Sequence, residues 1–422
     1  MKRYLFALLL FAASVPQALG QTTVIRAGRL IDPEAGTAAP NQTIVVEGGK
    51  VRSVGPNLEV PKGASVIDLS RSTVMPGLFD AHTHLCLTIN LKRDAGNYFL
   101  TSIRDPDSYR AIQGVANARD MLAAGFTTVR DVGNEGDYAC VSLRRAIAGK
   151  LVPGPTMLTA GRIIAPYGGQ FHLQPGRREL GEPEYLFADT RDEMRKAVRE
   201  NAHFGALVIK IVVDDQRYIY STEDIRFIVE EARAAGLKVA AHAWTTAGIH
   251  NAVAAGVASV EHVNAITDED LGAAKRGGVT LVFTPFPEWV LRELGSTAEE
   301  AAKEYRDTGE RLGTAYRLGV PIAFGTDAGS ASPNHTRGTL AISWVDSYTA
   351  AGIPPRALLR MMTVNAARLL GVEGTRGTIK PGMAADIIAT PANPLEDAQA
   401  LKRVNFVMKD GVVFKNEADV KP

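Results

Sequence analysis

The chain has few cysteines, almost no net charge and few long apolar runs. Only Cys86 and Cys140 occur in its 422 residues, which excludes a disulfide framework and leaves open whether these two residues pair. The formal net charge is +1, which gives no reason to expect nucleic acid or an anionic membrane as a partner. Hydrophobic residues make up 45% of the chain, a share that is ordinary for a globular enzyme with a large core.

The only apolar run that needs separate treatment lies at the N-terminus. A Lys-Arg pair precedes the run 4–13, which is too short to span a membrane. Ala18-Leu19-Gly20 then offers small residues at the positions that signal peptidase reads. We therefore expect residues 1–20 to be a cleaved signal peptide and Gln21 to begin an exported protein, either periplasmic or secreted. A buried N-terminal helix is the alternative. No cysteine lies near the cleavage point to carry a lipid, so no membrane anchor is expected.

The two ends of the mature chain share a pattern of short strands. Residues 43–54 are typical of a hairpin with a glycine turn, and residues 406–414 of a hairpin with an Asp-Gly turn. Chain termini often lie close together in a domain. We therefore expect residues 21–73 and 376–422 to form one small β-sandwich domain.

The middle of the chain, residues 74–375, alternates apolar β-branched runs with Ala-, Glu- and Arg-rich stretches such as 222–235 and 298–317, which are typical of helices. The candidate strands are 74–81, 126–132, 156–160, 207–213, 238–241, 259–263, 280–284 and 322–326. Eight strands separated by helices predict an α/β fold with a parallel sheet, closed into a (β/α)8 TIM-type barrel. A doubly wound open sheet is the alternative, but the glycine-rich phosphate turn it would need after the first strand is absent.

Four of the eight histidines and one aspartate fall at the ends of candidate strands. His82 and His84 end the first strand, and because side chains alternate along a strand, both rings point to the same face and can hold one ion. His242 and His262 end the fifth and sixth strands, and Asp327 follows the eighth. A lone strand-end histidine is usually an ordinary core or surface residue, and a lone aspartate there usually caps a helix.

Lys210 differs from these residues because it lies inside the apolar fourth strand. An unpaired ammonium is costly to bury, so this lysine needs a partner or a changed chemical state. Catalytic residues of such barrels gather at the carboxyl ends of the strands. The joint register of all six residues therefore predicts a single functional site.

These residues also carry a family resemblance. Asp80-Ala81-His82-Thr83-His84, after Met75-Pro76-Gly77, resembles the opening signature of the amidohydrolase superfamily. Later stretches that resemble its motifs are 125–131, 259–262, 325–329 and 377–386. The resemblance covers nearly the whole mature chain. It is strongest to the prolidase-like and carboxypeptidase-like subgroup, which includes ochratoxin-hydrolysing enzymes.

The resemblance implies a site with two divalent metal ions, of which zinc is the first candidate. Its ligands would be His82, His84, Lys210, His242, His262 and Asp327, with Lys210 carboxylated on its amine and Asp327 serving also as the catalytic proton shuttle. Chemistry agrees with these roles, because a carbamate offers two anionic oxygens that can bridge two ions. Imidazole and carboxylate groups suit zinc and its neighbours in the periodic table.

Four loop residues are candidates for substrate contact. His172 lies in the loop after the third strand, where related enzymes use a histidine to touch the substrate. Arg217 and Tyr218 follow the fourth strand and could bind a carboxylate, although the Gly/Ser-rich turn of many relatives is missing here. His335 lies in the loop after the eighth strand. A solvated loop residue is an equally consistent interpretation for each of them.

These observations predict an exported, metal-dependent hydrolase that cleaves an acyclic amide bond in dipeptides or N-acyl amino acids by a metal-bridging hydroxide. One alternative is a deaminase or cyclic amidase similar to imidazolonepropionase, but Lys210 argues against a deaminase, which usually holds one ion. A non-catalytic exported binding protein is the other alternative. A small-molecule substrate is the only partner that the site requires, and a homo-oligomer is left open.

Overall fold

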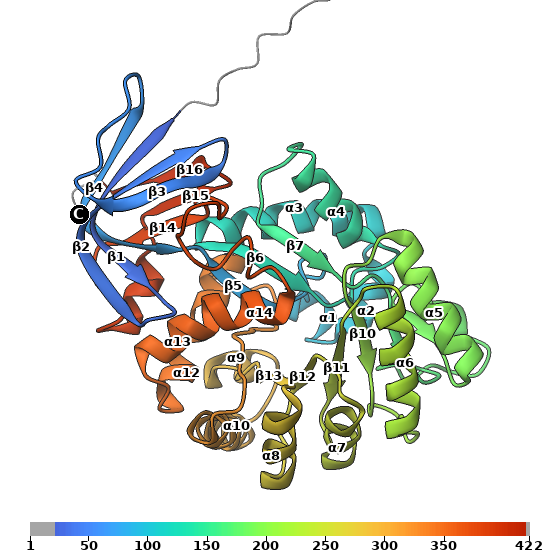
Figure 1. Cartoon of the computed structure of the whole chain (residues 1–422). Coiled ribbons are helices and arrows are strands. Elements are labelled where there is room, and N and C mark those ends of the chain that lie inside the picture. Colours follow the sequence, from blue (N-terminus) through green and yellow to red (C-terminus); the bar gives the residue numbers. More distant parts are fainter. Residues whose placement is uncertain (1–21, 419–422) are drawn as a thin grey trace, which may run out of the picture.

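The computed structural model describes residues 22–418, so the expected signal peptide lies outside the described residues. A sheet built from both chain ends lies beside a larger part in which strands and helices alternate (Figure 1). Within residues 22–418, no helix has the length and apolar character needed to cross a membrane.

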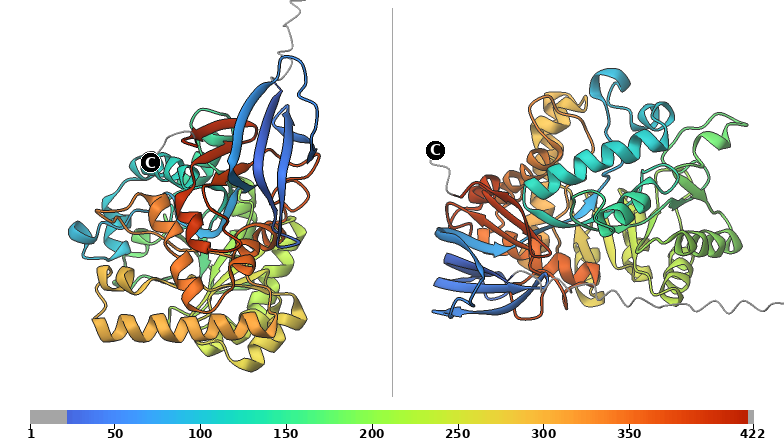
Figure 2. Two further views of the ribbon diagram at one scale, coloured as in Figure 1. Left: turned by 90° about the vertical axis from the view of Figure 1, so that its left-hand side faces the viewer. Right: turned by 90° about the horizontal axis from the view of Figure 1, so that it is seen from above.

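The two ends of the chain meet in one seven-stranded sheet, with the order β16-β15-β14-β4-β1-β2-β3. Its strands are β1 (Thr23–Asp32), β2 (Thr37–Glu47), β3 (Lys50–Pro56), β4 (Ser65–Pro76), β14 (Ile387–Thr390), β15 (Phe406–Lys409) and β16 (Val412–Asn416). Strand β4 joins the two ends, because it pairs with β1 in parallel and with β14 antiparallel. The sheet also folds back on itself, since the Val51 amide in β3 donates to the Met383 carbonyl at 2.9 Å and the Ala385 amide donates to the Gly49 carbonyl at 2.9 Å. Figure 2 shows the strands of the two chain ends beside each other.

Apolar side chains from both ends share one core in this sheet. Ile25 and Ile44 from the N-terminal strands cluster with Ile387 and Phe406 from the C-terminal strands, and all four are fully buried. Gly28 allows the bulge in β1 beside β4, because a Cβ atom there would lie 2.1 Å from the carbonyl oxygen of Ser70.

The larger part contains two parallel sheets, with the orders β5-β6-β7 and β13-β12-β11-β10-β8-β9. Their strands are β5 (Leu78–Thr83), β6 (Phe126–Asp131), β7 (Thr156–Thr159), β8 (Ile163–Ala165), β9 (Tyr185–Phe187), β10 (Ile209–Val212), β11 (Val239–Ala243), β12 (Ser259–His262) and β13 (Thr280–Val282). The predicted first strand is divided at Gly77 between β4 and β5, and β9 was not predicted. The third candidate strand is followed directly by β8, which pairs with β10.

The predicted eighth strand, 322–326, is not a regular strand in the structure, but its backbone still links β13 to β5. The Ala323 amide donates to the Leu281 carbonyl at 3.2 Å, and the Ala81 amide donates to the Phe324 carbonyl at 2.9 Å. The Asp327 amide donates to the carbonyl of His82 at 2.9 Å. These bonds bring Asp327 beside the end of β5.

Helices lie between successive strands and on the outer side of the sheets (Figure 1). They are α1 (Leu91–Asp94), α2 (Tyr98–Arg104), α3 (Asp107–Ala123), α4 (Ala139–Ala148), α5 (Arg191–Phe204), α6 (Thr222–Ala234), α7 (Thr246–Ala255), α8 (Asp268–Gly277), α9 (Glu288–Glu293), α10 (Ala298–Leu318), α11 (Arg337–Ile342), α12 (Val345–Ala350), α13 (Pro355–Arg360) and α14 (Ala366–Leu370). The predicted helices 222–235 and 298–317 correspond to α6 and α10. A capping box of Thr297 and Glu300 begins α10.

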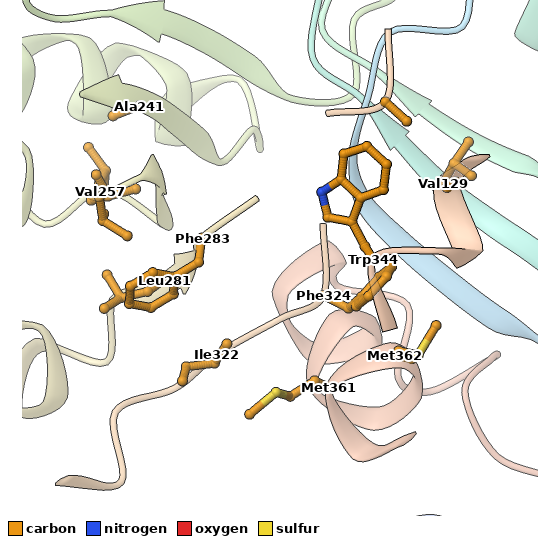
Figure 3. Close-up of a cluster of buried hydrophobic side chains, with 14 of the residues drawn as sticks. Val129, Ala241, Val257, Leu281, Phe283, Ile322, Phe324, Trp344, Met361 and Met362 are labelled. Atoms are coloured by element: carbon orange, nitrogen blue, oxygen red, sulfur yellow. The ribbon is translucent and has the colours of Figure 1, made fainter. Parts of the chain in front are cut away.

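The largest apolar core packs strands against these helices. Leu281 and Phe283 come from β13 and its end, and Phe324 and Trp344 come from segments further along the chain; all four are fully buried (Figure 3). The side chains of the two cysteines are also buried, with their Sγ atoms 2.7 Å apart as free thiols.

Candidate metal centre

The structure brings the six predicted ligands to one cavity of about 180 Å³. They come from β5 and the residue just after it, from β10, β11 and β12, and from the irregular segment that ends at Asp327. Together they line the cavity: His82, His84, Lys210, His242, His262 and Asp327. The four histidines and the lysine are each 6% exposed or less. Strand register alone therefore located a set of side chains that converge in space.

His82 and His84 direct their ring nitrogens at each other. Their Nε2 atoms are 3.2 Å apart, and Nε2 of His84 lies 3.2 Å from Oδ1 of Asp327. The Nδ1 atom of His82 is hydrogen-bonded to the Glu261 carboxylate at 2.8 Å. The Nδ1 atom of His84 is hydrogen-bonded to the Gly133 carbonyl at 2.7 Å. Because those acceptors require a proton on Nδ1, both Nε2 atoms present lone pairs beside a carboxylate oxygen. These two nitrogen atoms and Oδ1 of Asp327 are three acceptors that lie close together, an arrangement suited to binding a cation.

The pKa values of two of the four histidines, His82 and His262, support the same conclusion. Burial, followed by the positive charge of Lys210, lowers the pKa of His82 to about 4. Burial also lowers the pKa of His262 well below its usual range. Neutral imidazole is the form that binds metal ions.

His242 and His262 form the other half of the cluster, with ring centroids 4.6 Å apart. Nδ1 of His262 is paired with the Thr284 hydroxyl at 2.8 Å, which leaves Nε2 of His262 free to bind an ion. The indole of Trp244 stacks on the His262 ring at 4.7 Å and 1°. Nε2 of His242 lies 2.9 Å from Oδ2 of Asp215, but without the geometry of a hydrogen bond.

Lys210 lies within β10 and is 2% exposed. Among the described residues, its amine makes no hydrogen bond and no ion pair. Burial lowers the pKa of Lys210 to about 8, against the opposing effect of the Glu261 and Asp327 carboxylates. More of the amine is thus uncharged near neutral pH than in an ordinary lysine, and the uncharged amine is the form that can react with carbon dioxide.

Two of the ligands stand on left-handed backbone. The φ angles are 74° at His262 and 56° at Asp327, and Thr284, which pairs with His262, has 45°. Residues other than glycine rarely adopt this conformation, and where they do the surrounding structure must hold them. The local turn directs both side chains into the cavity at the point where the strands end.

Charged residues behind the ligands hold the first strand in place. Arg130 donates to the Ala81 carbonyl at 2.6 Å and to Glu261 at 2.7 Å, and Glu261 binds His82. The pKa of Glu261 is held well below its usual range, because the charge of Arg130 and the hydrogen bond from His82 outweigh the effect of burial.

Asp80 has a similar role on the other side of β5. It accepts a hydrogen bond from the Thr326 hydroxyl at 2.7 Å and another from the His82 amide at 3.1 Å. Burial raises the pKa of Asp80 to about 7. Sequence reasoning quoted Asp80, Arg130 and Glu261 inside motifs but assigned them no role, although three charged residues in buried strands were a usable signal.

The four residues predicted to contact substrate do not line the cavity. His172, Arg217 and Tyr218 are exposed, and His335 stacks on Trp289 at 5.0 Å. The loop of His172 instead contributes Gln170, two residues earlier, to the cavity wall.

Comparison with known proteins identifies the family. The sequence pattern described as "Amidohydrolase family" matches residues 73–414. The chain belongs to the amidohydrolase family. This amidohydrolase is therefore a hydrolytic enzyme that acts on carbon–nitrogen bonds, as the sequence predicted.

Three relatives place the amidohydrolase within the family. It is 29% identical to the ochratoxinase of Aspergillus niger over 96% of this chain and 89% of that one. It is 26% identical to the imidazolonepropionase of Shewanella loihica over 86% of this chain and 91% of that one. The structure is similar to that of a Xaa-Pro dipeptidase with methionine bound in its active site, with a TM-score of 0.81, 29% identity, and coverage of 94% of this chain and 100% of that one. The resemblance to the prolidase-like and ochratoxinase-like subgroup is thereby confirmed.

The amidohydrolase family is metal-dependent, and the residues present fit divalent ions. His82, His84 and Asp327 offer ligand atoms that all lie within 4.8 Å of one another. Their donors are imidazole nitrogens and a carboxylate, which suit zinc and its neighbours.

Proposed function

We propose that this amidohydrolase cleaves an acyclic amide bond in a small molecule. The observation that carries the proposal is the convergence of four imidazoles, a buried unpaired lysine and Asp327 in one cavity. The similarity to an ochratoxinase and to a Xaa-Pro dipeptidase supports it. Dipeptides and N-acyl amino acids are the predicted substrates, although Arg217 and Tyr218, the expected partners of a substrate carboxylate, lie away from the cavity.

We also infer that residues 74–375 form a closed (β/α)8 barrel. Backbone hydrogen bonds of Ala323 and Ala81 connect β13 to β5 through the irregular eighth segment. On the other side, the Leu207 amide donates to the Thr159 carbonyl at 2.8 Å and connects the third and fourth strands. The described parts of the two chain ends, 22–73 and 376–418, then form the additional domain.

The ligand set supports two ion positions. His82 and His84 with Asp327 would hold one ion, and His242 with His262 would hold the other, zinc being favoured by these donors. Lys210 would join them as a carbamate: the neutral amine adds to carbon dioxide, a C–N bond forms, and the amine proton leaves to water. When bound, the ions supply a Lewis acid for the carbonyl oxygen and a hydroxide nucleophile.

Asp327 is the proposed proton carrier. It is the most exposed of the six ligands, with a side chain 22% exposed toward the cavity. Its carboxylate accepts a proton as the nucleophile attacks and then delivers it to the leaving amine nitrogen, which cannot depart as an anion. The left-handed backbone at Asp327 holds this carboxylate beside His84.

A cyclic-amide substrate is the second candidate, since imidazolonepropionases are also similar to the chain. The buried Lys210 argues against a deaminase, which usually holds one ion, and does not distinguish a cyclic from an acyclic amide.

The decisive experiment combines metal analysis with a substrate screen. Mature protein loaded with zinc is expected to hold about two ions and to hydrolyse dipeptides, N-acyl amino acids or simple aryl amides. Imidazolone and lactam substrates serve as the opposing set. Hydrolysis confined to the cyclic set, or absence of bound metal, would contradict the proposal.

A further inference from the structure

The cavity is lined by two chemically different sets of residues. The six predicted ligands form one set. The other set is apolar and forms what we call the apolar chamber, defined by the lining residues Leu87, Ile89, Phe286, Val290, Leu294 and Trp344. The rings of Phe286 and Trp344 meet edge to face at 5.4 Å. This chamber can bury a large apolar group, since each apolar side chain or ring removed from water stabilises the complex.

The lining offers no positive charge for a substrate carboxylate apart from the ligand cluster itself. Among the described residues that line the cavity there is no arginine, and Lys210 is the one lysine. The remaining polar members are neutral: Tyr98, Asn134, Gln170 and Ser330. A carboxylate that entered the chamber would be desolvated without a counter-charge, which is costly.

The carboxylate of Asp215 lies beside Gln170, which is part of the cavity wall. Oδ2 of Asp215 accepts a hydrogen bond from Nε2 of Gln170 at 2.6 Å, and Gln170 in turn accepts one from the Tyr185 hydroxyl at 2.9 Å. Oδ2 of Asp215 also lies 2.9 Å from Nε2 of His242. A carboxylate at this position repels a second carboxylate that enters the cavity.

We propose that the preferred substrates are amides without a carboxylate in which at least one substituent is bulky and apolar, aromatic or branched aliphatic. The proposal rests on the proposed amide hydrolysis and narrows it. An aromatic group fills the apolar chamber, and the absence of a carboxylate avoids both the desolvation cost and the repulsion by Asp215. N-acyl amino acids would therefore be poorer substrates than the corresponding amides without a carboxylate.

The test uses a matched substrate pair with the metal-loaded, full mature chain. N-benzoylphenethylamine and N-benzoylphenylalanine differ only by the carboxylate on the amine side. We expect kcat/KM to be about tenfold or more higher for N-benzoylphenethylamine. If N-benzoylphenylalanine is hydrolysed equally well or faster, the inference is overturned and amide hydrolysis is left intact. Failure to cleave either amide counts against both proposals.

A substitution in the chamber tests its location. Leu294 ends α9 and is half-buried at the cavity wall, so Leu294→Arg adds a guanidinium there without displacing a fully buried residue. Leu318→Arg is the matched control, because Leu318 is 43% exposed at the end of α10 and does not line the cavity. We expect the kcat/KM ratio of N-benzoylphenylalanine to N-benzoylphenethylamine to rise about tenfold in Leu294→Arg only. An unchanged ratio, or the same rise in the control, would show that the substrate lies elsewhere.

Discussion

Glu261 on β12 binds His82 on β5 through a hydrogen bond of 2.8 Å, although the two strands belong to different sheets. The carboxylate keeps the proton of His82 on Nδ1 and turns Nε2 toward His84. Partners of this kind orient a metal-binding imidazole and raise its basicity.

Replacement of this carboxylate should weaken metal binding. In Glu261→Gln the neutral amide stabilises the orientation of His82 less than the carboxylate does. We therefore expect metal affinity to fall about 10- to 100-fold. Competition with a chelator measures the affinity directly. Glu310→Gln, at an exposed position on α10, is the control. Equal affinity in both variants would show that Glu261 has no such effect.

Loss of the lysine amine should remove both activity and metal. We expect Lys210→Ala to lose most of one metal equivalent and nearly all turnover, since no side chain then bridges the two positions. Short carboxylates such as propionate should restore part of the activity by supplying the missing oxygens. Metal analysis and a rescue titration check this. Full activity with unchanged metal content would exclude a carboxylated Lys210.

Substitution of the proton carrier should separate amides from esters. Asp327→Asn keeps one ligand oxygen but cannot carry a proton, so kcat for an amide should fall roughly 100-fold or more with metal content near wild type. An ester with a good leaving group needs no protonated departure and should suffer less. If the variant cleaves amides at nearly the parent rate with its metals in place, the proton travels by another route.

A methyl group added at Gly325, which packs against His82 and Val282, should destabilise the protein and weaken metal binding. A Cβ atom at Gly325 would lie 2.4 Å from Cγ1 of Val282 and 2.9 Å from Cβ of His82, so Gly325→Ala must displace one of them. We expect a loss of about 1–3 kcal/mol in the free energy of unfolding, together with weaker metal binding. Gly374→Ala, where nothing lies within 4 Å, is the matched control. Denaturant titration measures the free energy of unfolding of both variants, and metal analysis measures their metal content. Values equal to those of the parent protein for Gly325→Ala would contradict the prediction.

Export remains a prediction from the N-terminal sequence. Protein purified from its natural source should begin at or near Gln21, because the Ala18-Leu19-Gly20 stretch precedes that residue. N-terminal sequencing of the mature protein measures this. A retained Met1 would rule out cleavage.

The six predicted ligands were accessible to sequence reasoning because strand alternation and barrel topology are regular. His82 and His84 share a face through their spacing alone, and a parallel arrangement brings His242 and His262 to neighbouring strand ends. Asp327 was placed correctly beside them although segment 322–326 is irregular. Its position depends on hydrogen bonds to β5 and β13 that no local pattern encodes.

The loop side chains could not be predicted, since contacts distant in sequence decide where they point. Gln170 reaches the cavity wall through Tyr185 and Asp215, whereas His172 in the same loop faces solvent. Arg217 and Tyr218 likewise follow their own turn outward. The strand order of the sheet formed by the chain ends could not be predicted either. It depends on the pairing of β4 with both β1 and β14, which neither end of the sequence specifies alone.

The pairing of β4 with β14 also sets an order of events during biosynthesis. β4 runs into β5 through Gly77 alone, and the Gly77 amide donates to the carbonyl of Asp386 at 3.0 Å. The strand that carries His82 is thus anchored to a segment that leaves the ribosome about 300 residues later, although folding during synthesis generally starts from the N-terminus. Nascent chains therefore cannot complete the anchor of β5 before the last strands emerge, and a truncation before β14 releases a chain whose first two histidines lack their support.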